Sequence, residues 1–391
     1  MSKIKITSIQ NWLLVLAFIA MFEPDALNKL VIIHRLCQGI TILTFAWLLC
    51  ECLYSHHGFD RILGITFVYG LIMIFSSITN GNLEISTIRI ILAIINIVLC
   101  FEKYAFDRVR WALLYAFGLL ILINLMFSCI QPGSLAYVNQ ISGWFLTGSN
   151  ALIIYCLPAC CISIASIEMG KQKLLAIAII VMSFITVLLS ETATSLFAIF
   201  ILIMLWLVQK FFKFTVLNIK STVTIIVLVF IICVVLQVQD KISIINYIIV
   251  DILQRDISFT SRTFIWRESI RLIMQSPVIG YGFSYGFHVV VGSVGFWADH
   301  AHDHYLQQFI QGGVIQFALF ICIIIEMIKK MRKLSLQTIY WAICSVFVIG
   351  IVYLFESYTN PMIYSVFYLI YYNCKNTMSI KNHVKPTIGC K

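Results

Sequence analysis

Two stretches of this chain, TSRTFIWRESIRLIMQSPVIGYGF at residues 260–283 and WADHAHDHYLQQFIQGG at residues 297–313, differ from the long apolar segments on either side of them. Together they contain six arginine and histidine side chains: Arg262, Arg267, Arg271, His300, His302 and His304. Ionisable groups gathered in one part of a membrane protein usually have a function. We therefore expect the functional site in these stretches, held at a membrane surface by the rest of the chain.

The composition predicts a membrane protein. Of the 391 residues, 61% are hydrophobic and only 11% are charged, whereas soluble domains carry about 25% charged residues. The net charge of +10 would suggest a nucleic-acid partner in a soluble protein, but here it reflects the basic excess of cytoplasmic loops. We expect no nucleic-acid partner. The cysteines avoid residues 239–305, which argues against an external domain held by disulfides.

The apolar runs predict an all-α polytopic membrane protein with about twelve transmembrane helices. The first run follows Lys3 and Lys5 and extends to Phe22 without a cleavage site, so we interpret it as an uncleaved first helix. The runs begin near Ile9, Gln38, Ile62, Arg89, Trp111, Ala151, Leu174, Ser195, Thr222, Leu306, Leu336 and Pro361. Most of the basic residues fall on one side of this layout, and the positive-inside rule then places both termini in the cytoplasm.

The layout indicates a single integral membrane domain over residues 1–391. Residues 239–305 form a loop insertion between the ninth and tenth helices, on the external side, which is the periplasm in a bacterium. Its apolar segment Ile242–Leu253 is too short to span a membrane and is predicted to lie in the interface as an amphipathic helix. A second helix is predicted to begin with Ser261 as its N-cap and to end before Pro277, which cannot continue it.

Arginines beside a membrane surface suit a lipid-linked diphosphate, because the planar guanidinium can bind two phosphate oxygens at once. The alternative is that these arginines reach towards the membrane surface or pair with acidic residues of the same loop. Asp256 and Glu268 are the available partners.

His302 is the histidine that best suits chemistry. It is expected at the N-terminus of the tenth helix, with Asp303 beside it as a cap. The positive end of a helix dipole disfavours imidazolium, so His302 would stay neutral and able to accept a proton. Two alternatives remain open: a structural histidine, or a metal site formed with His300 and His304. The metal site requires an extended backbone, because alternate residues face one way only on a strand.

Several motifs in this chain resemble those of a known family. They are Arg262-x-x-x-Trp266, Pro277-x-x-Gly280-x-Gly282, His302-Asp303-x-Tyr305-Leu306, Gly312-Gly313 and the upstream Gly143-x-Phe145 followed by Asn150. Their order, the twelve-helix layout and the large late external loop resemble the O-antigen ligase and polymerase superfamily, which includes the Wzy-type polymerases and the WaaL ligases. The specific motifs cover residues 143–150 and 261–313 only.

The resemblance implies a metal-independent glycosyltransferase, without a cofactor, at the periplasmic face of the bacterial inner membrane. Its donor would be an undecaprenyl-diphosphate-linked glycan. Arg262 would engage the diphosphate, and His302 would activate the acceptor hydroxyl. Further substrate contacts suggested in this way are Arg267, Arg271, Arg89, Asn150, Asp303, His304 and Tyr305. Membrane lipids, a chain-length regulator and a flippase are the suggested partners.

Two positions depart from the family pattern. The family usually has Asn after the histidine, where this chain has Asp303. It often has a basic residue early in the eighth helix, where this chain reads SETATS at residues 190–195. One diphosphate contact is therefore missing or is supplied by another residue, such as Arg271 or Arg89.

Three functions were compared. The preferred one is polymerisation of repeat units into O-antigen or capsular polysaccharide, by moving the growing lipid-linked chain onto a new unit. The alternative is a ligase that moves finished polysaccharide onto lipid A-core. Both use the same donor, and only the form of the histidine motif and the missing basic residue near Ala193 favour the polymerase. A transporter would show paired broken helices and midplane charges, and the six prolines do not occupy matched positions.

Overall fold

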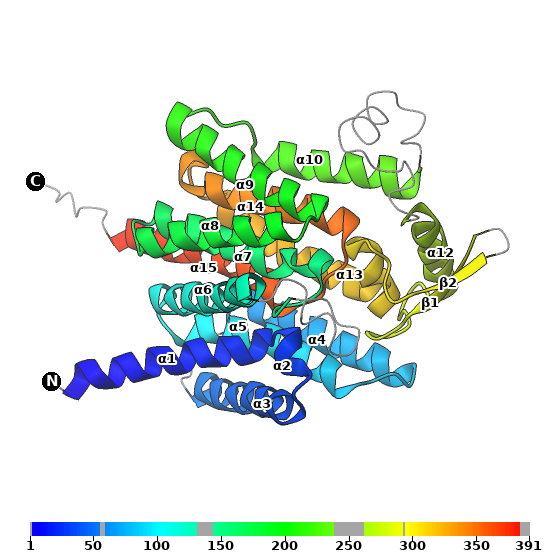
Figure 1. Ribbon diagram of the computed structural model, residues 1–391, viewed down its shortest axis with the longest axis horizontal. Helices are drawn as coiled ribbons and strands as arrows, with labels where there is room; N and C mark the ends of the chain where they lie inside the picture. The colour runs from blue at the N-terminus through cyan, green and yellow to red at the C-terminus, as the bar shows by residue number, and fades with distance from the viewer. Residues whose placement is uncertain (1, 55–58, 131–143, 238–261, 292–293, 384–391) are drawn as a thin grey trace, which may run out of the picture.

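The computed structural model describes residues 2–54, 59–130, 144–237, 262–291 and 294–383. Most of these residues lie in long helices that pack side by side (Figure 1). The first half of the chain forms α1 (Ser2–Phe22), α2 (Asp25–Asn28), α3 (Val31–Tyr54), α4 (Arg61–Thr79), α5 (Ile85–Lys103), α6 (Phe106–Ile130), η2 (Ser149–Ala151) and α7 (Ile153–Glu168). The second half forms α8 (Lys173–Leu189), α9 (Ala193–Phe212), α10 (Ile219–Val229), η3 (Phe230–Val235), α12 (Arg262–Gln275), β1 (Phe287–Val291), β2 (Val294–Ala298), α13 (His304–Met331), α14 (Leu336–Phe355) and α15 (Pro361–His383).

The prediction of an all-α polytopic membrane protein is confirmed. Within the described residues, eight helices are long and apolar enough to cross a membrane, and three shorter apolar helices accompany them. A helix is present at the position of each expected span, with α10 and η3 together forming the ninth. How many of these helices cross the membrane stays a prediction, as does the extent of the external loop. The segment Ile242–Leu253, expected to lie in the interface, is outside the described residues.

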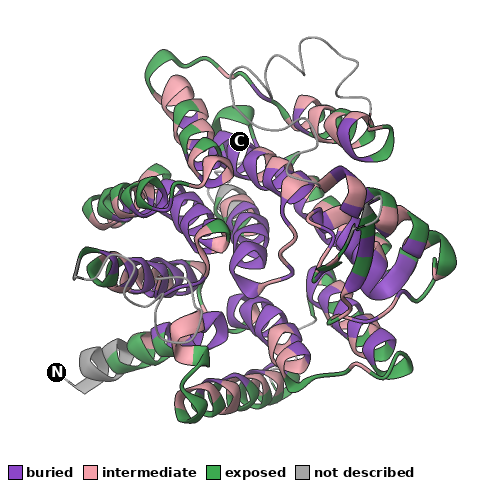
Figure 2. Ribbon diagram, turned by 45° about the vertical axis from the view of Figure 1, so that its right-hand side comes forward, coloured by how far each residue is buried: buried purple, intermediate pink, exposed green. Residues whose placement is uncertain are grey.

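Burial divides the bundle into inner and outer helices. In α7, 78% of the most apolar window is buried inside the protein, whereas in α3 only 22% is buried. The outer helices present their exposed apolar residues outwards, and the buried residues face neighbouring helices (Figure 2). An apolar outer face is what a lipid-facing helix requires, because the bilayer core offers no water to solvate polar groups.

The two ends of the bundle differ. The beginning of α1 and the end of α15 lie at one end, and α12 with the two strands projects from the opposite end (Figure 1). This arrangement agrees with an even number of crossings. It is the arrangement that the charge distribution predicts for two cytoplasmic termini and an external insertion.

The projecting part is here named the hairpin unit and comprises residues 262–291 and 294–303. The sequence analysis did not predict strands after α12, but β1 and β2 pair as an antiparallel hairpin in which Phe287 faces Ala298. The strands form because their residues alternate: Phe287, Val289 and Ala298 are buried, whereas Trp297 is exposed on the other face. The buried face packs with Trp266 of α12 in a second hydrophobic cluster.

Helix α13 is broken at Gly312–Gly313, where both residues have non-helical backbone angles. A break leaves helix carbonyls without their usual amide partners. The turn that follows α12 supplies these partners. The amide of Tyr281 donates to the carbonyl of Ile310 at 2.7 Å. The amide of Gly282 donates to the carbonyl of Gln311 at 3.0 Å.

The same turn is fixed from two other directions. On the far side of the break, the amide of Val314 donates to the carbonyl of Pro277 at 2.8 Å. From α4, the Ser76 hydroxyl donates to the carbonyl of Ile279 at 2.7 Å. From the turn that follows α4, Asn82 Nδ2 donates to the carbonyl of Tyr281 at 2.7 Å. The Pro-x-x-Gly-x-Gly motif and the Gly-Gly motif are therefore two halves of one joint between the hairpin unit and the bundle.

This joint predicts the effect of Gly313→Ala. Gly313 has φ of 64° and ψ of −162°, a region occupied almost only by glycine, at a cost of about 1–3 kcal/mol for other residues. A Cβ would also overlap the carbonyl of Val278. We expect a clearly lower midpoint of thermal unfolding for the purified variant in detergent. Gly64→Ala is the control, because a Cβ at Gly64 in α4 meets nothing within 4 Å. Equal stability of the Gly313→Ala and wild-type proteins would contradict the joint.

The topology predicts opposite locations for two reporter fusions. A fusion after Lys220, which begins the ninth span, should report the cytoplasm. A fusion after Gly292, in the expected external insertion, should report the periplasm. An alkaline phosphatase and a green fluorescent protein fusion at each position measure this directly. If both positions report the same side, the twelve-helix layout is wrong.

Candidate active site

Arg262 and Glu356 form an ion pair at the junction of the hairpin unit and the bundle. Arg262 is the first described residue of α12, and Glu356 directly follows the end of α14. Arg262 Nη2 lies 2.6 Å from Glu356 Oε1, with side chains 20% and 7% exposed. A partly buried pair at this distance is screened by solvent much less than a surface pair. It therefore fixes the guanidinium close to the end of α14.

His302 faces the other oxygen of the same carboxylate. His302 Nδ1 lies 3.8 Å from Glu356 Oε2, and the His302 side chain is 33% exposed. The Nδ1 atom is buried and makes no hydrogen bond with the described residues, so the exposed part of the ring is the remainder, which carries Nε2. The carboxylate of Glu356 thus stands between the two side chains, Arg262 and His302, that the sequence analysis proposed as catalytic.

The backbone around His302 is unusual. His302 has φ of 49°, which non-glycine residues rarely adopt and which persists only where the surroundings impose it. Two contacts hold it here. The amide of Ala301 donates to Gln307 Oε1 at 2.9 Å, and the amide of His302 donates to His300 Nδ1 at 3.2 Å.

Tyr358 adds a hydroxyl and links Asn150 to the site. Its hydroxyl lies 3.2 Å from Glu356 Oε2 and 3.2 Å from the carbonyl oxygen of Asn150. Asn150 therefore approaches through its backbone in the η2 turn, not through its side-chain amide. The segment before α7 is in this way tied to the segment between α14 and α15.

The electrostatics of the cluster favour a charged Glu356 and a neutral His300. Burial alone would raise the pKa of Glu356, but the neighbouring His302 and Arg262 outweigh it and hold the pKa below its ordinary value. Burial, together with the nearby His302, lowers the pKa of His300 to about 4. A neutral His300 can accept the hydrogen bond from the backbone of His302.

Asp303 is the N-cap of α13, as expected. Its Oδ1 accepts a hydrogen bond from the amide of Leu306 at 2.7 Å. The side chain is completely buried, and burial raises its pKa well above the ordinary value of an aspartate. At Oδ1 the buried Asp303 side chain presents the same kind of acceptor as the side-chain carbonyl of an asparagine would. The departure from the family pattern at this position therefore conserves the cap.

His304 and Tyr305 turn away from Glu356 into the bundle. The buried ring of His304 stacks on Tyr353, with centroids 3.8 Å apart. Tyr305 donates from its hydroxyl to the carbonyl of Gly350 at 3.3 Å. His300 and His302 have ring centroids 4.1 Å apart, but His304 does not join them. The described residues contain no group of three or more His, Cys, Asp or Glu that could hold a metal ion.

A buried polar network supports the first turns of α13. Gln308 Nε2 lies 3.2 Å from His304 Nε2 and 3.1 Å from the hydroxyl of Thr359. The hydroxyl of Tyr69 donates to Gln308 Oε1 at 2.8 Å. Satisfied buried polar groups fix a single arrangement, so this network holds the helix whose start positions His302 relative to the segment after α14.

The other loop arginines lie on the outside of α12. Arg271 is exposed and pairs with Glu268, its Nε lying 2.9 Å from Glu268 Oε2. Arg267 lies 3.3 Å from Gln237 Oε1 and beside the ring of Phe264. Neither contacts Glu356. These two arginines are accessible to an anion, but the structure does not bring them into the cluster with Arg262.

Arg89 belongs to a separate polar cluster at the same end of the bundle. Arg89 Nη1 lies 2.7 Å from Glu23 Oε2, and His34 Nδ1 lies 2.8 Å from Glu23 Oε1. The Glu23 side chain is fully buried, so its negative charge requires these two partners. Arg89 is thus part of a contact that fastens the segment after α1 to α3 and α5.

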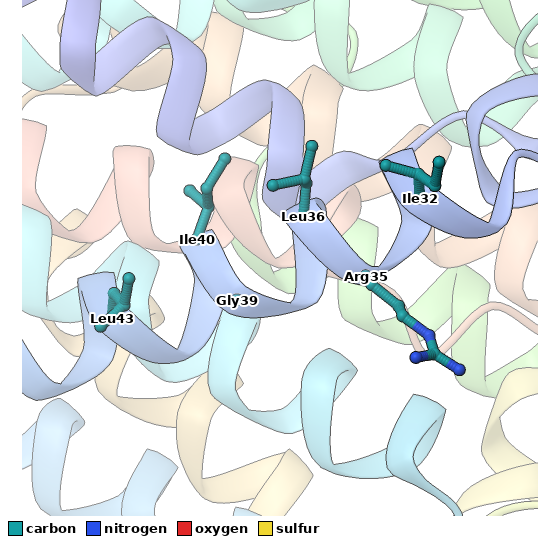
Figure 3. A pocket seen from close by; sticks show the side chains of 6 residues that line it. All are labelled: Ile32, Arg35, Leu36, Gly39, Ile40 and Leu43. Carbon is teal, nitrogen blue, oxygen red and sulfur yellow. The ribbon is translucent and has the colours of Figure 1, made fainter.

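A groove on the outer face of α3 is formed by one helix alone. It has a volume of about 390 Å³ and is lined by Ile32, Arg35, Leu36, Gly39, Ile40 and Leu43. Ile32, Leu36 and Ile40 point to one side of the helix, whereas Arg35 points to another (Figure 3). An apolar groove on an outer helix fits lipid contact, and the groove includes none of the expected site residues.

Glu356 and Tyr358 were not among the residues expected in the site. The sequence analysis had no reason to connect the segment between α14 and α15 with Arg262, which lies 94 positions earlier. The available signal was an acidic residue at the end of an apolar helix, on the side expected to hold the arginines. Such a residue needs a partner when it is buried.

Comparison with known proteins finds one family match. Residues 177–321 match the family model described as O-antigen ligase. The matched segment runs from α8 into α13, so it contains Arg262 and His302 but ends before Glu356. No curated protein sequence matches the chain.

Proposed function

The family match supports a place for this chain in the O-antigen ligase and polymerase superfamily, and on that premise we propose that it polymerises glycan repeat units. The repeat units are carried on undecaprenyl diphosphate. The growing lipid-linked chain is moved onto a new unit at the periplasmic face of the bacterial inner membrane. The product is O-antigen or capsular polysaccharide.

The observation that carries this proposal is the pairing of Arg262 and His302 on one carboxylate. Glycosyl transfer from a lipid diphosphate needs a group that binds the diphosphate and a base that activates the acceptor hydroxyl. Arg262 and His302 have these chemistries and both lie against Glu356. Both side chains are partly exposed, so both are accessible to substrates.

The donor half of the reaction falls to Arg262. When the anomeric C–O bond breaks, the electron pair leaves with the diphosphate, and negative charge grows on its oxygens. A guanidinium stabilises this charge through two parallel hydrogen bonds. Only Nη2 of Arg262 is bonded to Glu356, and no other donor of this guanidinium is bonded to a residue that the structure describes, so phosphate is proposed to bind the remaining donors. Arg271 and Arg267, on the outside of α12, are proposed as secondary contacts to the same anionic donor.

The acceptor half falls to His302. Its exposed Nε2 takes the proton of the acceptor hydroxyl as the oxygen attacks the anomeric carbon, and Glu356 stabilises the imidazolium that results. No metal ion is needed in this scheme, because Arg262 carries the charge that a metal would otherwise carry. Asp303, His304 and Tyr305 are proposed to hold His302 in place, and Asn150 to position Tyr358.

Substitution of the two central residues should separate the two halves of the reaction. Arg262→Lys keeps the charge but loses the two parallel hydrogen bonds of the guanidinium, so the KM for the lipid-linked donor should rise. His302→Ala removes the base, whose assistance is typically worth about 10² to 10⁴ in rate, so kcat should fall by that order. Both are measured as chain lengthening by purified protein in lipid nanodiscs.

His288→Ala is the matched control for His302→Ala. His288 lies in β1 of the same unit, on its exposed face beside Trp297, and we expect wild-type activity for this variant. Near wild-type activity of a correctly inserted His302→Ala protein would eliminate His302 as the base.

The ligase is the second candidate, because the matching family model is described as O-antigen ligase. The two enzymes share a donor and differ in acceptor, so deletion of the gene distinguishes them. Loss of a polymerase should leave single repeat units on lipid A-core, or no surface glycan if the product is a capsule. Glycolipid gels and analysis of lipid-linked intermediates measure this. Long undecaprenyl-linked chains together with bare core would instead identify the ligase.

A further inference from the structure

Glu356 holds its two site partners unequally. Its Oε1 lies 2.6 Å from Arg262, a strong ion pair, whereas its Oε2 lies 3.8 Å from His302 Nδ1, beyond hydrogen-bond distance. The carboxylate is 7% exposed, so water does little to solvate it. In this arrangement Arg262 and, more weakly, the Tyr358 hydroxyl at 3.2 Å from Oε2 hold the carboxylate, and the histidine does not.

The histidine nitrogen that faces Glu356 lacks a hydrogen-bond partner. His302 Nδ1 is buried and makes no hydrogen bond with any residue that the structure describes. Buried polar atoms without a partner are unfavourable and are rare in native proteins. A movement of the Glu356 carboxylate by about 1 Å would bring Oε2 within hydrogen-bond distance of this nitrogen. A small movement would therefore form a hydrogen bond between Glu356 and His302 that is absent from the structure.

A bound lipid diphosphate would change this balance. Its phosphate oxygens compete with the Glu356 carboxylate for the Arg262 guanidinium, because both are anions that accept its hydrogen bonds. When the diphosphate binds the Arg262 guanidinium, the ion pair between Arg262 and Glu356 weakens. Burial raises the pKa of Glu356, but His302 and Arg262 together hold it below the ordinary value. The side chain is therefore a charged carboxylate, which can bind either Arg262 or His302.

We propose that Glu356 is a positioning residue that exchanges partners: donor binding draws Arg262 onto the diphosphate and lets Glu356 bind His302 Nδ1. This inference rests on the proposed function. A carboxylate on Nδ1–H leaves Nε2 as the free base and favours the protonated ring. His302 therefore becomes the stronger base only after the donor is bound. An acceptor hydroxyl is then not activated at an empty site, and donor binding precedes chemistry.

Several groups surround His302 and bear on its titration. The charged and titratable groups around His302, counting those that face its neighbours Glu356 and His300, are Arg262, Glu356, Tyr358, His300, Asp299 and Asp303. Burial lowers the pKa of His300 to about 4 and raises that of Tyr358, so both stay neutral near neutral pH. Glu356→Gln removes one charge from this set and leaves the others, which isolates its contribution.

The test is a titration of His302 in the full-length protein in lipid nanodiscs. The probe is undecaprenyl diphosphate, the released product, which the protein does not consume. Binding is followed by thermal shift, and the protonation of His302 by its pH-dependent reaction with diethyl pyrocarbonate, read by mass spectrometry. Undecaprenyl diphosphate should raise the pKa of His302 by about one unit in the wild type, the size expected for a new charged partner.

In Glu356→Gln the rise should be less than half as large, because only the direct effect of the phosphate charge remains. Glu356→Asp, which keeps a charge on a shorter side chain, should recover part of the rise and also serves if Glu356→Gln fails to fold. Glu168→Gln is the control. It removes a carboxylate that is paired with Lys210 and belongs to neither the hairpin unit nor the cluster around Glu356, and it should behave as the wild type.

The outcomes separate this inference from the proposed function. An equal rise in wild type and Glu356→Gln would overturn the partner exchange, as would binding of undecaprenyl diphosphate without any rise. If undecaprenyl diphosphate does not bind to the wild-type protein, both the partner exchange and the proposed function are contradicted. A rise that depends on Glu356 supports both.

Discussion

The joint between the turn at residues 277–282 and the break in α13 sets the geometry of the site. Helix α13 interrupts its own hydrogen bonding at Gly312–Gly313, and the turn after α12 supplies the missing partners. The hairpin unit is thereby attached to the bundle through backbone atoms, which allow little sliding. Arg262 begins α12, which leads into the turn, and His302 lies two residues before α13, which contains the break. Their positions relative to each other follow from it.

The joint by itself brings an arginine and a histidine to one end of the bundle, and Glu356 connects them. A buried carboxylate between two basic groups is stable only while at least one of them is charged. The cluster is therefore sensitive to any anion that competes for Arg262. A catalytic site for a diphosphate-linked substrate needs this sensitivity, whereas a contact that served stability alone would be better buried and less exposed to solvent.

Much of the fold could be predicted because it depends on local pattern. Apolar runs located the helices, Pro277 located the end of α12, and the polar start of α13 identified Asp303 as a cap. The site was predicted in part. Its arginine and histidine lie in a polar segment of an apolar chain, which singles them out. Glu356 and Tyr358 are brought in by packing between segments far apart in the chain: Glu356 lies 94 positions from Arg262, and Tyr358 lies 208 positions from Asn150. No local pattern in the sequence indicates such contacts.

The remaining arginines show the same limit. Arg89 and Arg271 carry the charge that a diphosphate needs, and sequence alone cannot tell a free arginine from a paired one. Glu23 neutralises Arg89 in a buried pair, and Glu268 holds Arg271 in an exposed one. An exposed pair is weak and can yield to a substrate, whereas a buried pair cannot be broken without leaving a charge unpaired. Arg271 therefore remains the better candidate for a second donor contact.

The central claim is metal-free glycosyl transfer from a lipid diphosphate at the cluster of Arg262, Glu356 and His302. Its most direct test supplies the purified protein in lipid nanodiscs with undecaprenyl-diphosphate-linked repeat units and lipid A-core, in the presence of EDTA. The account predicts release of undecaprenyl diphosphate and a longer glycan on one of the two acceptors. Failure to release undecaprenyl diphosphate with either acceptor, or release only after a divalent metal is restored, would contradict it.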